Sequence, residues 1–405
     1  MNVLIIGGGG REHAIAWKIS QSPLCDTLIA APGNPGIAQV ARCVTPPSSD
    51  PAVLVNLARE FGADVTIVGP EVPLVAGVAD AFRSAGLTII GPTAEAARLE
   101  GSKVYAKEFM TEFDIPTARY RVADNAAEAR KALADFDFPV VLKADGLAAG
   151  KGVVIAHDAA EAAQALTRLP QGRFVVEECL RGEEVSYIAY STGSVAIPFD
   201  TTQDHKAAFD GDKGPNTGGM GAYCDTRILS DEQRRLVEDA IIAPTLEGMR
   251  RRGTIFTGFL YAGLMMTDDG PKVLEFNVRL GDPEAQPLMY RMKSDLLATL
   301  LDGEPMEWNP DPSVCVVMAA AGYPGPPRTG DLITGIEDCG ATVFLAGAKT
   351  TADGLVTAGG RVLGVTSSGP DLRTAIANTY AAVEKIHFDA AHYRTDIGQK
   401  GLKRW

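Results

Sequence analysis

The stretch KVLEFNVRLGDPEAQ, residues 272–286, decides how the rest of the chain is interpreted. Its apolar start favours a strand, and the Asp-Asp-Gly-Pro sequence at 268–271 is typical of a hairpin turn. Glu275 and Asn277 lie two residues apart, so on a strand their side chains point to the same face. A carboxylate and an amide oxygen together suit Mg²⁺ that also binds phosphates. Arg279 continues this face and suits a phosphate in transfer or a carboxylate.

An edge strand with solvated polar residues is the alternative interpretation of a lone Glu-x-Asn pattern. Here the polar face is followed directly by Gly281, Asp282, Pro283 and Glu284, where an ordinary strand would return to apolar residues. This continuation favours a functional site.

Length, charge and cysteine content limit the class of protein. At roughly 150 residues per domain, 405 residues predict about two to four domains, and 46% apolar residues supply an ample core. The net charge of -13 argues against nucleic acid or an anionic membrane as a partner. The six cysteines show no metal-binding spacing, and no apolar run reaches the roughly 20 residues of a membrane span. We therefore expect a cytoplasmic protein with reduced thiols, no membrane segment and no nucleic-acid partner.

Residues 1–100 alternate strands with helices. Apolar runs at 3–6, 28–31, 65–68 and 87–90 are typical of buried parallel strands, and helices are expected at 12–20, 51–61 and 75–84. This order predicts a doubly wound open sheet, which binds ligands at the carboxyl ends of its strands.

The glycine run at 7–10, directly after the first strand, favours a phosphate site over a dinucleotide site. Glu12 stands where the third glycine of a dinucleotide fingerprint belongs, and the second strand ends without the acidic residue that would bind a ribose. A helix start lined with glycine amides still binds a phosphate. A tight turn alone is the alternative, but four consecutive glycines exceed what a turn needs.

A helix is expected at 100–113, and a second glycine-rich segment follows at 144–153, between predicted strands at 140–142 and 153–155. It is not a Walker loop, because three residues separate Gly146 from Gly150, Gly152 replaces the Ser/Thr, and a strand follows. Its glycines and Lys151 suit a mobile lid over a polyphosphate. A simple hairpin connection is the alternative, although such loops usually have about two to five residues.

Three later segments complete the pattern. After a strand at 174–177, backbone groups at 178–180 could bind an adenine edge, and Glu183 or Glu184 could bind ribose hydroxyls, although acidic pairs are usually solvated. Residues 203–223 are expected to form a long polar loop, and such loops are usually functional or disordered. The part after Trp308 carries short strands and Gly/Pro turns, and we assign it a covering and substrate-closing role.

These segments together resemble the ATP-grasp superfamily and, within it, the phosphoribosylamine–glycine ligase (glycinamide ribonucleotide synthetase) family. The similarity covers almost the whole chain, and GPNTGGMGAY (214–223) with RLGDPEAQ (279–286) is highly specific to this family. The other matching stretches are GGGGREHA (7–14), APGNPG (31–36), IVGPEVPLVAG (67–77), GSK (101–103), KADGLAAGKGV (143–153), EECLRGEE (177–184) and QDHK (203–206).

The resemblance implies ATP-dependent ligation of glycine to 5-phospho-D-ribosylamine, giving glycinamide ribonucleotide, ADP and phosphate through a glycyl phosphate, in de novo purine biosynthesis. It implies ATP and Mg²⁺ (or Mn²⁺), with Glu275 and Asn277 as the metal ligands. No enzyme nucleophile is required, which fits the absence of a convincing Ser/His/Asp or Cys/His set in the sequence. We expect a monomer.

The resemblance also assigns the other site residues. The catalytic candidates are Arg279 and Asp212. The ATP-binding candidates are Lys103, Lys143, Gly146, Gly150, Lys151, Gly152, Glu177, Glu178, Leu180 and Glu184. The substrate-binding candidates are Gly8, Gly9, Gly10, Glu12, Asn34, Pro35, Glu71, Asn216, Thr217, Gly218 and Gly219.

The implied fold is an α/β ATP-grasp fold in four parts. Residues 1–100 would form the doubly wound parallel-sheet domain that binds phosphoribosylamine. Residues 101–120 and 188–309 would form the central domain with the metal site, and residues 121–187 the lid. Residues 310–405 would form a small C-terminal α+β domain.

Two features depart from the family pattern. Ala207 stands where an arginine usually follows His-Lys, which leaves Lys206 and Arg279 as the nearest cations. The segment at 166–173 is shorter than the glycine-rich insertion of many relatives, so closure over ATP could be looser.

Two other functions remain as alternatives. One is a non-catalytic nucleotide-binding relative, and the other is an ATP-grasp ligase for a different acid or amine. The first would have lost its metal and phosphate residues, whereas this chain retains Glu275, Asn277, Arg279, Lys103 and Lys143.

Overall fold

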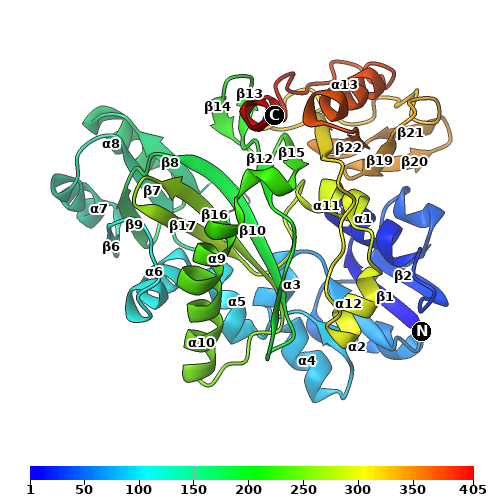
Figure 1. The fold of residues 1–405 in the computed structure, drawn as a ribbon, viewed down its shortest axis with the longest axis horizontal. Helices are drawn as coiled ribbons and strands as arrows, with labels where there is room; N and C mark the ends of the chain where they lie inside the picture. Colours follow the sequence, from blue (N-terminus) through cyan, green and yellow to red (C-terminus); the bar gives the residue numbers. More distant parts are fainter. Residues whose placement is uncertain (149–151) are drawn as a thin grey trace.

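The computed structural model describes residues 1–148 and 152–405, and its first part is the expected parallel sheet (Figure 1). The strand order is β3-β2-β1-β4-β5. β1 is central because residues 3–6 are apolar and at most 3% exposed, as a strand covered on both faces requires. The strands are β1 (Asn2–Gly7), β2 (Thr27–Pro32), β3 (Arg42–Cys43), β4 (Val65–Val68) and β5 (Ile89–Ile90), and the helices between them are α1 (Gly10–Ile19), α2 (Pro51–Glu60), α3 (Glu71–Val75) and α4 (Val78–Ser84).

The single helix expected at 100–113 is wrong, because the structure has two helices there, α5 (Ala94–Gly101) and α6 (Lys103–Glu112). Ser102 separates them with an extended backbone, and its hydroxyl accepts the N–H of Tyr105 at 3.1 Å. Serine is favoured at such a position because its side chain satisfies a backbone donor that the first helical turn leaves unpaired. The break places Lys103 at the first position of α6.

The next part is a four-stranded antiparallel sheet that projects at one end of the molecule (Figure 1). Its order is β6-β9-β7-β8, and α7 (Ala126–Ala132) and α8 (Ala159–Arg168) pack against it. The strands expected at 140–142, 153–155 and 174–177 are confirmed. The bounds are β6 (Tyr120–Ala123), β7 (Val140–Ala144), β8 (Val153–Ala156) and β9 (Phe174–Glu178).

The largest sheet crosses the centre of the molecule in the order β17-β16-β10-β12-β15-β18-β22-β19, with β11 paired to β10. The predicted hairpin at 268–271 is confirmed, because β16 and β17 pair antiparallel around it. Because β15 pairs with β18, the sheet continues without interruption from the hairpin into the C-terminal part. The bounds are β10 (Glu183–Ser191), β11 (Ala196–Pro198), β12 (Thr202–Asp204), β15 (Gly221–Cys224), β16 (Gly258–Thr267), β17 (Gly270–Asn277), β18 (Ser313–Ala319), β19 (Thr342–Leu345) and β22 (Arg361–Ser368).

The expectation of a long polar loop at 203–223 is also wrong. β12 and β15 occupy its two ends, and a short hairpin of β13 (Ala207–Phe209) and β14 (Lys213–Asn216) lies between them. β12 pairs with β10 and β15 pairs with β18. Glycine, asparagine and aspartate are depleted in strands, so the composition of this segment masks strands that pair with β10, with β18 and with one another.

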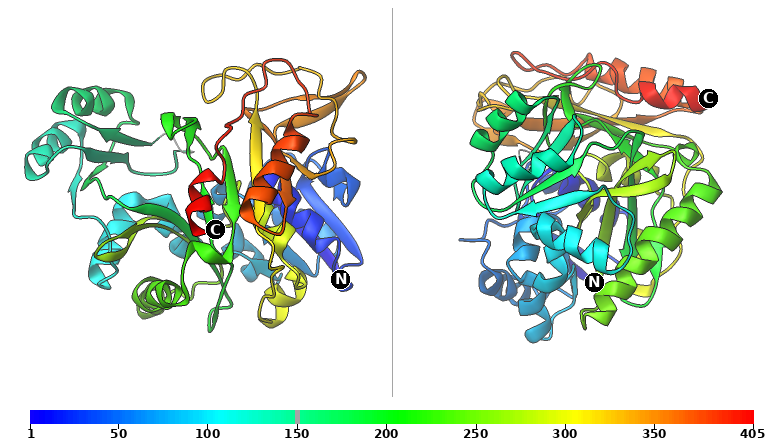
Figure 2. Two further views of the ribbon diagram at one scale, coloured as in Figure 1. Left: turned by 45° about the horizontal axis from the view of Figure 1, so that its top comes forward. Right: turned by 90° about the vertical axis from the view of Figure 1, so that its left-hand side faces the viewer.

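The remaining elements cover the sheets. The last of them brings the end of the chain back to the central sheet. The C-terminal 3₁₀ helix η5 (Gln399–Arg404) lies beside the central strands (Figure 2). No helix within residues 1–148 and 152–405 is long and apolar enough to cross a membrane. The other elements are α9 (Asp231–Val237), a π-helical turn (Glu238–Ile242), α10 (Ala243–Arg251), α11 (Ala285–Arg291), α12 (Leu296–Asp302), β20 (Ala348–Thr351), β21 (Gly354–Thr357), α13 (Leu372–Val383) and the 3₁₀ turns η1 (Ile37–Gln39), η2 (Leu133–Asp135) and η3 (Thr226–Ile228).

His13 joins the N-terminal and C-terminal parts of the chain. It lies on α1, is 6% exposed, and its Nδ1 accepts the N–H of Leu345 on β19 at 2.7 Å. Its ring meets that of Phe344 edge-on at 5.4 Å between centroids. Gly36 packs so closely against the ring that a Cβ there would overlap it. Burial lowers the pKa of His13 to about 4, so the imidazole is neutral near pH 7.

We expect His13 to make stability depend on pH between about 4 and 6.5. The unfolded chain binds the proton first as the pH falls below 6.5, so native stability decreases over this range by up to about 3 kcal/mol. His13→Gln keeps an acceptor for Leu345 without a titrating group, so its urea-denaturation midpoint should depend less on pH. His387→Gln, at an exposed histidine, is the control and should follow the parent protein. A His13→Gln profile identical to that of the parent would contradict this assignment.

Candidate functional site

One cavity of about 620 Å³ brings together most of the predicted site residues. It lies between the sheet of β6–β9, helix α6, the β16–β17 hairpin and the segment at 204–218, and the N-terminal and C-terminal parts contribute to its edge. Gly150 and Lys151 lie outside the described residues. The predicted residues that line the cavity are Glu71, Lys103, Lys143, Gly146, Gly152, Glu177, Glu178, Leu180, Glu184, Asn216, Thr217, Gly218, Glu275, Asn277 and Arg279.

Glu275 and Asn277 both line this cavity from β17, as the two-residue spacing predicts. Burial favours the neutral form of Glu275, but Lys206, Lys143 and Lys103 outweigh it and lower the pKa of this carboxyl to about 2. No group of three His, Cys, Asp or Glu side chains in the described part of the chain could bind a metal ion alone. Two protein oxygens leave the other positions to phosphates and water, which fits the way Mg²⁺ is usually bound.

Arg279 lies between two carboxylates from other parts of the chain. Its Nη2 donates to Glu100 at 2.6 Å and its Nε donates to Glu71 at 3.3 Å. A further bond from Nη2 reaches Oδ1 of Asn277 at 3.0 Å. Burial lowers the pKa of Arg279, but Glu100 and Glu71 raise it by more, so the guanidinium stays charged. No local sequence pattern points to Glu100, because its role depends on Arg279, which is 179 positions away.

Lys103 and Lys143 enter the cavity from different elements. Nζ of Lys103 donates to the carbonyl of Gly146 at 2.7 Å, which places this lysine beside the glycine-rich turn. Nζ of Lys143 donates to the carbonyl of Leu274 at 2.8 Å, beside the predicted metal ligands.

Glu177 makes a different contact from the one expected. The carboxylate of this predicted ATP-binding residue is 1% exposed and forms ion pairs with Lys143 and with Lys107, whose Nζ is 2.5 Å away. Sequence analysis missed Lys107, although it lies one helical turn after Lys103 on α6. Burial lowers the pKa of Lys107 to about 8, against the opposing effect of Glu177.

Glu184 lines the cavity from β10, where its carboxylate lies 3.5 Å from Nζ of Lys206. Lys206 is also 3.4 Å from Glu275. Lys206 therefore links the predicted ribose-binding residue to the predicted metal site, in the segment where Ala207 departs from the family pattern.

The N-terminal glycine run starts α1 beside this cavity. Gly9 is the N-cap, and its N–H donates to Glu12 at 2.5 Å, so Glu12 serves the helix start. Asn34 also organises this turn, because its amide donates to the carbonyl of Gly8 at 2.9 Å and its oxygen accepts two N–H groups of its own loop. A Cβ at Gly9 would lie 3.8 Å from Asp282, which lines the cavity. Gly8, Gly9, Gly10, Glu12, Asn34 and Pro35 adjoin the cavity without being among its lining residues.

The C-terminal part contributes two side chains that sequence analysis missed, Arg361 and Tyr323. Nη1 of Arg361 donates to the carbonyls of Gly218 at 2.7 Å and Asp282 at 2.6 Å, and its Nη2 donates to the carboxylate of Asp282 at 2.8 Å. The hydroxyl of Tyr323 accepts the N–H of Gly218 at 3.1 Å. Both side chains line the cavity.

Two other predicted residues of this segment have structural contacts. The carbonyl of Gly219 accepts from Arg361 at 3.4 Å. Asp212 lies away from the cavity lining, and its carboxylate accepts from Arg394 at 2.9 Å. Arg394 is 1% exposed and also donates to the carbonyl of Ala207 at 3.1 Å. These contacts give Asp212 a place in holding the β13–β14 hairpin, distant from Arg279.

Three family models together match most of the chain. They are described as phosphoribosylglycinamide synthetase N domain (residues 1–100), ATP-grasp (A) domain (residues 101–285) and C domain (residues 313–400).

Curated relatives match along their whole length. A phosphoribosylamine–glycine ligase of Xylella fastidiosa (strain 9a5c) is 48% identical, with 100% of this chain and 97% of the relative covered. The enzyme of the same name from Escherichia coli (strain K12) is 48% identical, with 100% and 99% covered.

Solved structures are also similar to this chain. The crystal structure of phosphoribosylamine–glycine ligase from Thermotoga maritima is 34% identical, with a TM-score of 0.87 and 98% and 100% of the two chains covered. N5-carboxyaminoimidazole ribonucleotide synthetase of the same organism, at 17% identity, 96% and 99% coverage and a TM-score of 0.67, shares the fold. From these matches and the geometry of its cavity, the chain belongs to the phosphoribosylamine–glycine ligase family of ATP-grasp proteins.

Proposed function

We propose that this chain joins glycine to 5-phosphoribosylamine at the expense of ATP, giving glycinamide ribonucleotide, ADP and phosphate in de novo purine biosynthesis. One observation carries the proposal. A single cavity contains the Glu275–Asn277 oxygen pair, the lysines at 103 and 143, and Arg279, and it adjoins the glycine-lined start of α1. A triphosphate and a phosphate monoester can therefore meet in one place.

ATP would lie between the sheet of β6–β9 and the β16–β17 hairpin. Lys103 and Lys143 would bind its phosphates, since both ammonium groups enter the cavity. Main chain at 178–180 would meet the adenine edge, and Glu184 the ribose hydroxyls. Gly146 and Gly152 belong to the proposed lid, which would close over the phosphates.

ATP-grasp proteins use ATP with a divalent metal ion, and here Glu275 and Asn277 would bind it as Mg²⁺ or Mn²⁺. A bound ion of this kind neutralises charge on the transferring phosphate oxygens. The chemistry of the pair fits, because Glu275 is ionised at neutral pH and both side chains supply hard oxygen ligands.

The reaction would pass through glycyl phosphate, formed when the glycine carboxylate attacks the terminal phosphorus of ATP and ADP leaves. The ribosyl amine then attacks the acyl carbon and phosphate leaves. Arg279 would stabilise charge that develops on the phosphate or the carboxylate, and its two ion pairs keep it oriented for this.

The acceptor, 5-phosphoribosylamine, would lie between the N-terminal and C-terminal parts. Its phosphate would meet the amides at 8–10, where the helix start favours an anion. Glu71 and the segment at 216–219 would contact the rest of it. We also propose that the chain divides into four parts, residues 1–100, 101–120 with 188–309, 121–187 and 310–405. We propose in addition that it is a monomer and is located in the cytoplasm.

A phosphate-release assay tests the function. ATP, glycine and phosphoribosylamine are supplied together and then with each omitted in turn. Phosphate and glycinamide ribonucleotide should form only from the complete mixture. Release with a different acid or amine, but not with this pair, would indicate another ATP-grasp ligase. Binding of ATP without release under any of these conditions would indicate a nucleotide-binding protein.

Glu275→Gln and Asn277→Ala should each abolish ligation while the thermal unfolding profile is unchanged. Removing one ligand misplaces the metal ion, and loss of a preorganised charge in such a site costs about 10²–10³-fold in rate. Mn²⁺ binding to each variant, followed by electron paramagnetic resonance with an ATP analogue, gives a readout independent of turnover. Asp269→Asn, in the exposed turn of the same hairpin, is the control. Near-normal turnover of both variants at saturating Mg²⁺ would refute the metal assignment.

Gly9→Val and Lys103→Met should separate the two phosphate sites. A side chain at Gly9 would lie 2.8 Å from Oε2 of Glu12 and in front of the helix amides, so the KM for phosphoribosylamine should rise about tenfold or more while that for ATP is spared. Lys103→Met should do the opposite. The KM of each substrate in each variant, with ATP-analogue binding measured alone, decides the assignment. The reverse pattern would place the nucleotide in the N-terminal part.

A further inference from the structure

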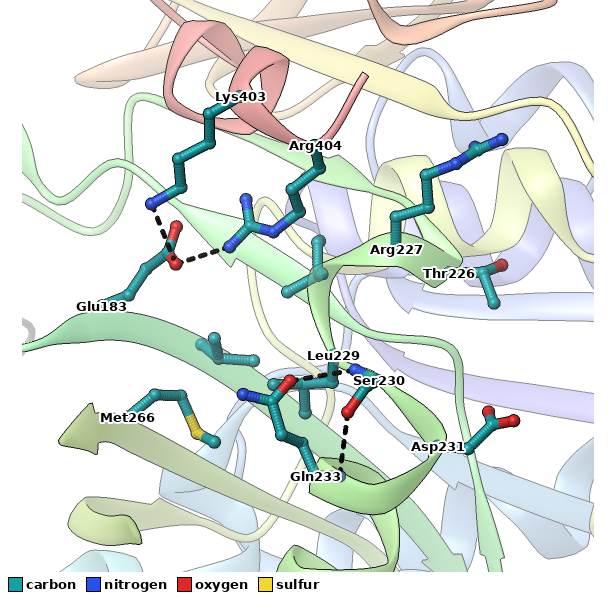
Figure 3. Close-up of a pocket in the computed structure, with 12 residues that line it drawn as sticks. Glu183, Thr226, Arg227, Leu229, Ser230, Asp231, Gln233, Met266, Lys403 and Arg404 are labelled. Atoms are coloured by element: carbon teal, nitrogen blue, oxygen red, sulfur yellow. Dashed lines mark hydrogen bonds and ion pairs between the residues drawn. The ribbon is translucent and has the colours of Figure 1, made fainter. Parts of the chain in front are cut away.

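A second pocket, of about 560 Å³, lies beside β10 and η5 (Figure 3). Glu183 and Glu184 are consecutive on this strand, so their side chains point to opposite faces. Glu184 lines the larger cavity, whereas Glu183 lines the second pocket together with Lys403 and Arg404 of η5. Only one strand therefore separates the proposed ribose-binding carboxylate from the C-terminal helix.

Lys403 and Arg404 converge on the carboxylate of Glu183 (Figure 3). Nζ of Lys403 is 3.2 Å and Nη2 of Arg404 is 2.5 Å from the same oxygen of Glu183. Burial raises the pKa of Glu183, but Arg404 outweighs it and the pKa is lowered overall. The Arg404 side chain is 15% exposed, so this pair is less screened by water and salt than a surface ion pair.

A chain of hydrogen bonds connects Arg404 to the main chain of Glu184. Nη1 of Arg404 donates to the hydroxyl of Tyr223 at 3.3 Å, and this hydroxyl donates to the side-chain oxygen of Gln203. The amide nitrogen of Gln203 donates to the carbonyl of Glu184 at 2.6 Å. Tyr223 and Gln203 are both 0% exposed. Inside a protein, breaking one member of such a chain leaves a buried polar group without a partner.

The end of the chain is also anchored beside these contacts. A Cβ at Gly401 would lie 2.7 Å from the Tyr223 hydroxyl, so a glycine allows η5 to approach this closely. Nε1 of Trp405 donates to Asp225 at 2.7 Å, and the guanidinium of Arg227 stacks 3.5 Å from the Trp405 ring. Arg404 is therefore placed by its neighbours, which lowers the entropic cost of its contacts with β10.

We propose that Arg404 is a positioning residue for the nucleotide. Through Glu183 and through Tyr223 and Gln203, it fixes the start of β10 so that the carboxylate of Glu184 faces ATP. The proposal rests on the proposed function, in which Glu184 binds the ribose. Arg404 is not among the residues that line the larger cavity, so its effect is on ATP affinity and not on the transfer step.

Arg404→Met tests this directly, because it removes the charge and the donors while keeping a side chain of similar length. The KM for ATP and the Kd of a non-hydrolysable ATP analogue should each rise about three- to tenfold. The kcat and the KM values for glycine and phosphoribosylamine should stay within about twofold. Glu183→Gln breaks the same pair from the other side and should produce the same selective change.

Two control variants separate positioning from general stability. Arg404→Lys keeps the charge beside Glu183 and should retain most of the ATP affinity. Arg328→Met removes an arginine of the C-terminal part that pairs with Asp331 and Asp389, away from β10, and should leave the ATP affinity unchanged. Equal losses of affinity for all three substrates in Arg404→Met, or an unchanged ATP affinity in both Arg404→Met and Glu183→Gln, would overturn the proposal.

Glu184→Ala distinguishes failure of this inference from failure of the proposed function. If it weakens the ATP analogue while Arg404→Met does not, Glu184 binds ATP and only the positioning role of Arg404 is refuted. If Glu184→Ala leaves analogue binding unchanged, the ribose assignment itself is wrong and the inference falls with it. Weakening by both variants, with no further loss in the double variant, is the expected result.

Discussion

The ion pairs of Arg279 are the constraint on which the site depends. Arg279 follows the end of β17, and its two carboxylate partners come from the start of α3 and the end of α5. Only 16% of the Arg279 side chain is exposed, and its charge needs such partners because desolvation costs several kcal/mol per ion. The same guanidinium donates to Asn277. The interaction that joins the N-terminal part to the hairpin therefore also orients Asn277, one of the two predicted metal ligands.

Both lysines and carboxylates line the larger cavity, although the chain as a whole is acidic. The chain carries a net charge of -13, yet the ammonium groups of Lys103, Lys107, Lys143 and Lys206 line one cavity. Glu177 separates two of them by pairing with both. Because carboxylates line the same cavity, the lysines offer a polyphosphate several oriented cations and not a net positive charge.

The C-terminal part does more than cover the site, because it also makes contacts that hold parts of the site in place. Arg361 connects the turn at 218–219 with Asp282, and Leu345 donates to His13 at the base of the glycine-lined helix. At the other end of this part, Arg404 reaches the back of β10. Its contacts adjoin the proposed acceptor side and the proposed nucleotide side of the cavity, so under the proposed function the relative placement of the two substrates would depend on it.

The sequence by itself determined the features that local patterns encode. The apolar run of β1, the glycine start of α1 and the Glu275–Asn277 spacing were predicted because strand periodicity and glycine amides act over a few residues. The order of strands and helices, together with the resemblance, was enough for the fold class.

Only the tertiary structure decided which distant residues meet. The pairing of β15 with β18, the pairing of Lys107 with Glu177, the contacts of Arg361 and the partner of Asp212 all join segments far apart in the chain. No local pattern specifies such pairs, because each depends on how the whole chain packs.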